Sequence, residues 1–178
     1  MIDKIKNFLI VKDNFFKPEV YQEILRDIST LKFENRYKMV DEKDKQLYNV
    51  YQKIYFSVDL NNDHFAVKEV HKQLTNYGLN IGNPTSYYFL SSKHEKITPH
   101  YDGSDINCLV YLKGKEIVNS GTGFFEKKED GSLILNRHIG FKENRAIIFD
   151  SKIYHTSLQY NDDAGSRFVM ANFIDYKK

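Results

Sequence analysis

The sequence of 178 residues has a single cysteine, Cys108, no tryptophan and only three prolines. One cysteine cannot form an internal disulfide, so a disulfide-stapled fold is excluded and a reducing compartment is expected. Without tryptophan, the aromatic part of a hydrophobic core must come from the 13 tyrosines and 13 phenylalanines. The composition is otherwise that of an ordinary globular protein.

Long hydrophobic runs and a surplus of charge of one sign are also absent. The longest apolar runs span a few residues, as at 146–149, and are too short to cross a bilayer. The 26 basic and 24 acidic residues leave a formal net charge of +2, which is too balanced to indicate nucleic-acid binding. The first residues lack the pattern of a secretory signal. We therefore expect a cytoplasmic protein with no membrane and no nucleic-acid partner.

The length predicts one domain spanning residues 1–178, in which 1–85 form a support of helices and strands and 86–178 form a β core. Apolar residues recur at helical spacing over 18–31 and 64–77, which predicts two amphipathic helices. Strands of this first part are expected at 8–11 and 48–58.

The ends of the second helix carry recognisable signals. Asn62 and Asp63 are expected to cap its start, and Gly78 is expected to end it. His64 and His71 lie seven residues apart on one helix face, and we expect both to be solvated.

The segment 35–53 is polar and mixed in charge. The simpler interpretation is a solvated loop. The alternative is a lid over a substrate, because long loops on a rigid scaffold often carry function.

After residue 84 the helical period disappears and short strands follow one another between turn residues. Strands are expected at 86–90, 106–112, 123–126, 132–136, 145–149, 155–158 and 168–175. Short strands at such regular intervals are typical of a mostly antiparallel sandwich or barrel.

His100 and Asp102 stand two residues apart where a strand is expected. Residues i and i+2 of a strand face the same side, so an imidazole and a carboxylate lie side by side with Tyr101 turned away. His155 would complete a set of two histidines and one carboxylate, which suits a non-haem Fe(II) site with open positions. Zinc also accepts such ligands, and a His-x-Asp pair alone is a weak signal. His138 is a rival third ligand, although it lies beside a turn.

Arg167 shares a strand face with Val169 and Ala171. A guanidinium on such an apolar face is costly to bury unless a carboxylate meets it, which predicts an anionic ligand. The alternative is a surface ion pair with Asp150 or Asp175.

Tyr111 alternates with Asn107 and Leu109 on one face of the strand that follows Asp102. Its hydroxyl could bond the same carboxylate as Arg167. A core tyrosine that reaches a backbone carbonyl is an equally good interpretation. Cys108 faces the other side, where a small buried hydrophobe is expected.

In their order and spacing, these residues resemble the 2-oxoglutarate- and Fe(II)-dependent oxygenases, and within them the prolyl-4-hydroxylase-like branch. The resemblance runs through Pro99-His-Tyr-Asp102, Ile106 to Lys113, Gly121-Thr-Gly-Phe-Phe125, Lys142 to Phe149, His155, and Arg167 to Phe173. It covers the chain from about Tyr87 onward, and the earlier part in outline, where Val11 to Phe16 before a helix is similar to the start of many such chains.

The resemblance implies a mainly β fold with flanking helices (α+β) around a double-stranded β-helix, or jelly-roll, core. It implies Fe(II) held by His100, Asp102 and His155, with 2-oxoglutarate anchored by Arg167 and contacted by Tyr111. The implied activity is that of a dioxygenase that uses O2 to hydroxylate a peptidyl residue or a small molecule, releasing succinate and CO2. Whether ascorbate is also needed stays open.

Two other functions compete with this one. A cupin-type zinc or manganese protein, acting as a hydrolase or isomerase, would use the same scaffold but need no anchor for a cosubstrate. A non-enzymatic jelly-roll binding module would have no reason to bury Arg167.

The sequence departs from the family pattern in three places. The pair Glu143-Asn144 stands where the family often has glycine. The gap between His155 and Arg167 is at the long end of the family's range. The tyrosine that often precedes the His-x-Asp pair could be Tyr87 or Tyr88.

Overall fold

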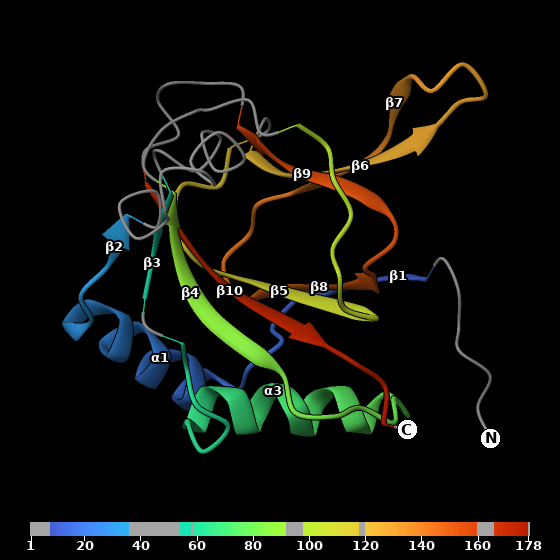
Figure 1. Ribbon diagram of the computed structural model, residues 1–178. Coiled ribbons are helices and arrows are strands. Elements are labelled where there is room, and N and C mark those ends of the chain that lie inside the picture. The colour runs from blue at the N-terminus through green and yellow to red at the C-terminus, as the bar shows by residue number, and fades with distance from the viewer. Residues whose placement is uncertain are drawn as a thin grey trace.

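The described residues form two antiparallel β-sheets and two helices, arranged in three layers (Figure 1). The computed structural model describes residues 8–35, 54–57, 59–91, 98–117, 120–159 and 166–177. A small sheet lies over one face of a larger sheet, and the helices cover the other face. This is the mainly β jelly-roll architecture with flanking helices that the sequence predicted.

The larger sheet has the strand order β1-β8-β5-β10-β4-β3-β2, and the smaller sheet has the order β7-β6-β9. The strands of the larger sheet are β1 (Leu9–Lys12), β2 (Glu34–Asn35), β3 (Ile54–Phe56), β4 (Thr85–Ser91), β5 (Ile106–Lys113), β8 (Arg145–Asp150) and β10 (Arg167–Ile174). Those of the smaller sheet are β6 (Ser120–Lys127), β7 (Leu133–Gly140) and β9 (Tyr154–Gln159). Each strand predicted after residue 84 is present, although β6 and β7 are longer than expected.

The two predicted helices are present as α1 (Pro18–Thr30) and α3 (Phe65–Asn76). Their apolar stripes pack on the outer face of the larger sheet, as the helical spacing of these residues requires. The buried helix residues are Tyr21, Ile24, Ile28, Ala66, Val67, Val70 and Leu74. Cys108 faces them and is fully buried, and burial raises the pKa of its thiol. Neither helix in the described part of the chain has the length and apolar character that a membrane span requires.

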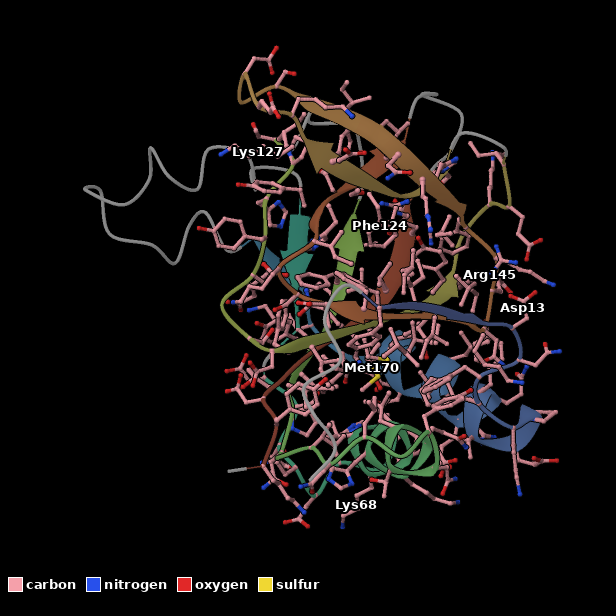
Figure 2. The ribbon with its side chains drawn as sticks, turned by 90° about the vertical axis from the view of Figure 1, so that its right-hand side faces the viewer. Asp13, Lys68, Phe124, Lys127, Arg145 and Met170 are labelled. Carbon is pink, nitrogen blue, oxygen red and sulfur yellow. The ribbon has the colours of Figure 1, made fainter. Side chains whose placement is uncertain are left out.

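A second, smaller core fills the space between the two sheets. Its buried members are Tyr111, Phe124, Phe141, Ile147, Phe149 and Val169. The members on the larger sheet alternate along their strands with residues that face the helices, because successive side chains of a strand point to opposite faces. Figure 2 shows Phe124 between the sheets and Met170 on the side of the helices. The residues predicted to bind ligands lie around this inner core.

The start of α3 differs from the prediction. His64 is the N-cap, and its Nδ1 accepts a hydrogen bond of 3.3 Å from the backbone N–H of Ala66. Its Nε2 lies 3.1 Å from Oδ2 of Asp27, and the Tyr88 hydroxyl donates to the same oxygen at 3.0 Å. The predicted caps, Asn62 and Asp63, and the solvated His64 are therefore wrong. A neutral imidazole offers the lone pair that a capping carboxylate would otherwise supply.

Two predictions concern segments that lie largely outside the described residues. The loop or lid at 35–53 is described only at Asn35, which ends β2. The strand predicted at 48–58 is described as β3, at Ile54–Phe56. The end of α3 is as predicted, because Gly78 has a φ of 78° and follows the C-cap.

Asn144 ties the chain before α1 to the start of β8. Its side chain accepts a hydrogen bond from the N–H of Phe16 at 2.9 Å and donates to the carbonyl of the same residue at 2.8 Å. Its φ is 57°, in the left-handed region where glycine is usual. The departure from glycine at this turn therefore adds two buried hydrogen bonds while Asn tolerates the backbone.

We expect Asn144→Ala to lower the free energy of unfolding by about 3 kcal/mol, because it strands two buried backbone groups and strains a positive φ. Asn144→Gly should cost about 1 kcal/mol less, since glycine relieves the strain but not the lost bonds. Asn14→Gly is the matched control, because Asn14 has a φ of 53° and an exposed side chain. Urea unfolding measures all three. Equal losses for Ala and Gly at position 144 would contradict the strain argument.

Candidate metal centre

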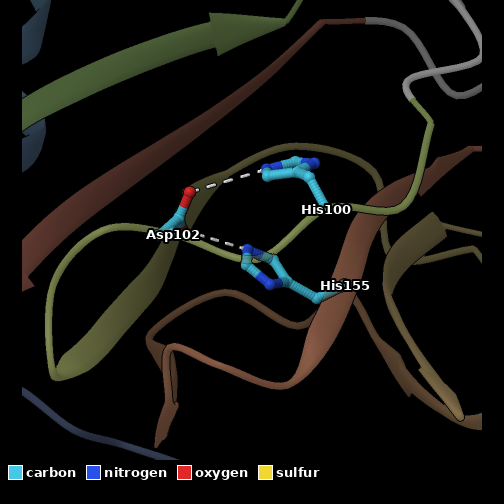
Figure 3. Close-up of side chains that lie close together, drawn as sticks. All are labelled: His100, Asp102 and His155. Carbon is cyan, nitrogen blue, oxygen red and sulfur yellow. Dashed lines mark ion pairs between the residues drawn. The ribbon is translucent and has the colours of Figure 1, made fainter. Parts of the chain in front are cut away.

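Strand pairing brings His100 and His155 together across 55 positions of sequence. The backbone N–H of His100 donates to the carbonyl of His155 at 3.0 Å, and the N–H of His155 donates back at 2.8 Å. This bridge places the His100 segment beside β9, with β6 on the other side of β9. Asp102 follows in the adjoining turn, and its side chain points between the two imidazoles (Figure 3).

The three side chains converge closely enough to share one ion. Nε2 of His155 lies 3.3 Å from Oδ2 of Asp102, and Nε2 of His100 lies 3.8 Å from Oδ1. The three candidate ligand atoms all lie within 4.8 Å of one another. Within the described ranges this is the one group of three or more potential metal ligands. The rival ligand His138 is not part of it and lies exposed on β7.

Both imidazoles are held in the form that a metal requires. Nδ1 of His100 lies 3.1 Å from the carbonyl of Thr98, and Nδ1 of His155 lies 3.0 Å from the carbonyl of Ile153. A carbonyl only accepts hydrogen bonds, so each Nδ1 carries the proton and each Nε2 keeps its lone pair. Both lone pairs are therefore available on the side of Asp102.

Burial and neighbouring groups favour the neutral form of His100 and the ionised form of Asp102. Burial lowers the pKa of His100, and the adjacent His155 lowers it further. Burial alone would raise the pKa of Asp102, but the neighbouring His155 and the hydrogen bond from Asn107 outweigh it and the pKa is lowered. The rings of Phe149 and Phe124 flank His155, the first at 4.8 Å between centroids, and leave its side chain 7% exposed.

Arg167 is buried between the two sheets, as its position on the strand predicted. Nη1 donates to Oγ of Ser120 at 3.1 Å and to the carbonyls of Gly121 and Leu158 at 3.2 and 3.3 Å. Nη2 donates to Oγ of Ser157. These partners in the described chain are all uncharged, and Nε is buried without a partner. The alternative of a surface ion pair is therefore wrong.

Arg145 shows how a guanidinium in this protein bonds when a carboxylate is present. Its Nε and Nη2 donate to the two oxygens of Asp13, at 2.6 and 3.1 Å, and its Nη1 donates to the carbonyl of Gly140 at 2.8 Å. Figure 2 shows Asp13 and Arg145 side by side. Arg167 has its Nη1 group satisfied in the same way, but no carboxylate occupies its Nε and Nη2 edge among the described residues. Since a guanidinium binds carboxylates through such an edge, Arg167 can accept an anionic ligand.

Tyr111 lies on the same inner face, stacked on Phe141 with 4.8 Å between ring centroids. Its hydroxyl is 2.7 Å from Oγ1 of Thr122 and 3.3 Å from the carbonyl of Ile139. Burial raises the pKa of Tyr111 to about 12, although the nearby Arg167 acts in the opposite direction. The hydroxyl reaches a backbone carbonyl, as the second interpretation expected, and its contact with a ligand carboxylate stays a prediction.

The orientation of β4 resolves the choice between Tyr87 and Tyr88. Tyr88 is fully buried on the side of the helices, where its hydroxyl bonds Asp27. Tyr87 faces the other way, and its ring packs on Phe173 at 5.6 Å between centroids. Tyr87 thus shares the inner face of the sheet with Arg167.

Sequence reasoning missed several residues around the site. Asn107 donates to Oδ2 of Asp102, and the predicted alternation with Tyr111 was a signal that it faces inward. Ser120 and Ser157 contact Arg167 without any such signal, because a serine fits either face of a strand. Thr122 lies in the Gly121 to Phe125 stretch, where the resemblance assigned no role to the threonine.

The sequence matches no protein-family model and no curated protein significantly. Solved structures nevertheless share its fold. HygX from Streptomyces hygroscopicus, with nickel, 2-oxoglutarate and hygromycin B bound, superposes with a TM-score of 0.65 at 11% identity, covering 97% of this chain and 84% of HygX. A Pseudomonas putida prolyl-4-hydroxylase gives 0.57 at 8% identity, covering 97% and 94%.

The non-haem α-ketoglutarate-dependent epimerase SnoN of nogalamycin biosynthesis is also similar, with a TM-score of 0.63 at 9% identity over 96% of this chain and 78% of SnoN. At such identities the likeness shows the fold. The chain therefore has the jelly-roll fold of 2-oxoglutarate-dependent oxygenases, as the sequence predicted.

In the metal-free protein, we expect His100 to titrate below the pKa of a free histidine, because burial and His155 disfavour its imidazolium. A lowered pKa keeps His100 neutral as the pH falls, so this one ligand stays able to bind a metal below the usual histidine range. His155→Gln should raise the midpoint of His100, since it removes one of the two causes. Histidine C–H chemical shifts followed against pH measure both. An unchanged His100 midpoint in the variant would show that His155 is not a cause.

Proposed function

We propose that this protein is an Fe(II)- and 2-oxoglutarate-dependent oxygenase. The observation that carries the proposal is a pair of complementary sites on one strand. His155 offers a metal ligand, and Ser157, two residues further along β9, bonds the guanidinium of Arg167. Residues i and i+2 of a strand lie about 7 Å apart on one face. A single small dicarboxylate can therefore meet both the metal and the guanidinium.

The side chains fit the metal that the fold implies. Two neutral imidazoles and one carboxylate are the ligand set of non-haem Fe(II) centres, which leave the remaining positions open. The backbone carbonyls of Thr98 and Ile153 fix the two imidazoles, so His100 and His155 need not reorganise to bind. Iron bound there would supply the activation of O2 and the oxidative decarboxylation of 2-oxoglutarate to succinate and CO2.

The chain's other residues bind and orient the cosubstrate. The Nε and Nη2 edge of Arg167 takes the far carboxylate of 2-oxoglutarate, which relieves the cost of a buried cation without a counter-charge. Tyr111 and Thr122, hydrogen-bonded to each other, face the same end of the space. Phe124 and Phe149 exclude water around His155. These residues leave the opposite, His100 side of the site more open, since that side chain is 38% exposed.

For the reaction we propose hydroxylation of a peptidyl residue or a small molecule. The similar structures support either substrate class, because one is a prolyl-4-hydroxylase and another holds hygromycin B. The alternative reaction is an epimerisation, because SnoN is an epimerase with a similar fold. A cupin-type metal site accounts for the triad, but it does not account for a buried Arg167 that has no carboxylate partner among the described residues. We retain a cytoplasmic location as part of the proposal, because Cys108 is free and buried.

We expect His100→Ala, Asp102→Ala and His155→Ala each to abolish or greatly weaken Fe(II) binding while the fold persists, because each removes one of three ligands. His138→Ala is the matched control and should bind as the unmodified protein does. Anaerobic iron stoichiometry, with circular dichroism for the fold, measures the set. Binding that survives His155→Ala but is lost in His138→Ala would show that the third ligand is misassigned.

We expect Arg167→Met to raise the 2-oxoglutarate concentration for half-saturation by about thirtyfold or more, since it removes a desolvated charge-assisted contact worth roughly 2–5 kcal/mol. Methionine keeps most of the volume, so Fe(II) binding should change little. Arg167→Lys should be intermediate because it keeps the charge and loses the fork. Tyr111→Phe should lose roughly 0.5–1.5 kcal/mol in the same direction.

These variants are compared in substrate-free turnover of 2-oxoglutarate. Arg145→Met is the control, because the edge of Arg145 is already filled by Asp13. It should reduce stability and leave the half-saturation concentration unchanged. An unchanged half-saturation concentration in Arg167→Met would show that Arg167 does not anchor 2-oxoglutarate, and it would favour the cupin-type site.

A further inference from the structure

We propose that Asn107 is the positioning residue of the metal centre, which orients the Asp102 carboxylate as a ligand through a single oxygen. The inference rests on the proposed metal site. Asn107 is fully buried on β5, and its Nδ2 donates to Oδ2 of Asp102. Because a carboxylate only accepts hydrogen bonds, the amide must present its NH2 group to Asp102.

A second bond fixes the amide itself. The hydroxyl of Ser104 donates to Oδ1 of Asn107 at 2.9 Å. The chain of donors therefore runs from Ser104 through Asn107 to Asp102, and each member is held by the one before it. A flipped amide would set its oxygen against Oδ2 of Asp102, which leaves two acceptors face to face.

Each of the three candidate ligands has one orienting partner, but these partners differ in kind. The imidazoles of His100 and His155 are held by backbone carbonyls, which no substitution removes. Asp102 is held by a side chain. Its carboxylate is free to rotate about the Cβ–Cγ bond unless Asn107 holds Oδ2. With Oδ2 engaged, Oδ1 on the side of His100 is left as the single metal ligand, and the other coordination positions stay open.

Asn107 is well placed for this task. Its Cα partners are Phe149 in β8 and Phe173 in β10, so it stands in a central strand with neighbours on both sides. Phe149 also packs edge-on against the ring of His155. Asn107 on β5 and its pairing partner Phe149 on β8 therefore support Asp102 and His155 from adjacent strands.

A buried asparagine can also serve the fold alone, and Asn172 shows this case. It is fully buried in the neighbouring β10, where it accepts from Ser86 at 2.7 Å and donates to the carbonyl of Cys108 at 2.8 Å. Neither of these two hydrogen bonds involves His100, Asp102 or His155. Asn172→Leu is therefore a matched control for the loss of a buried amide.

The test is the binding of Co(II), added alone to the metal-free full chain and followed by visible absorption and calorimetry. We expect Asn107→Leu to weaken Co(II) binding by about 10- to 100-fold, the usual effect of removing a partner of a metal ligand. Its Co(II) band should also shift, because the carboxylate binds in another orientation. Ser104→Ala should weaken binding in the same direction by a smaller factor, and it stays informative if Asn107→Leu fails to fold. Asn172→Leu should lose stability and keep both the affinity and the band.

Unchanged Co(II) affinity in Asn107→Leu, or in Ser104→Ala if only that variant folds, would overturn the inference and leave the proposed function intact. An equal loss in Asn172→Leu would also overturn it, because the effect would then follow from stability. Failure of the unmodified protein to take up Co(II) would overturn the proposed function, and the role of Asn107 with it.

Discussion

The constraint on which the rest of the site depends is the backbone pairing of β9, with β6 on one side and with the His100 segment on the other. On one side its backbone bonds the His100 segment, which brings the two histidines together and sets Asp102 between them. On the other side it pairs with β6, and the two strands together supply the oxygens that surround Arg167. One strand therefore fixes the spacing between the proposed metal site and the proposed anion site, and this spacing suits a small dicarboxylate.

The buried guanidinium of Arg167 accounts for the serine hydroxyls and backbone carbonyls that line this part of the inner core. A cation between two sheets is costly, and in this chain neutral oxygens of serine and backbone offset only part of that cost. Arg145 has a carboxylate partner in Asp13, whereas Arg167 has none among the described residues, which supports our proposal that a ligand supplies the counter-charge. In the proposed function, binding of the far carboxylate of 2-oxoglutarate would relieve this cost.

Much of this site could be predicted from the sequence, because the two-residue period of a strand decides which side chains share a face. The two-residue spacing of His100 and Asp102 and the alternation around Arg167 predicted which side chains share a face. The strands after residue 84 followed from apolar runs between turns. Periodicity carries no information on which serine meets which donor, so Ser157 and Ser120 were missed. His64 as a cap was missed because propensity ranks aspartate and asparagine first, whereas only the tertiary position of Asp27 makes the histidine suitable.

The central claim is that one small molecule bridges the metal and Arg167. The most direct measurement is an anaerobic titration of the Fe(II)-loaded protein with 2-oxoglutarate, followed by visible absorption. The account predicts a weak charge-transfer band that requires both iron and 2-oxoglutarate and saturates at one equivalent. Iron that binds tightly while 2-oxoglutarate produces no band would contradict it, and would leave a metal centre that does not use this cosubstrate.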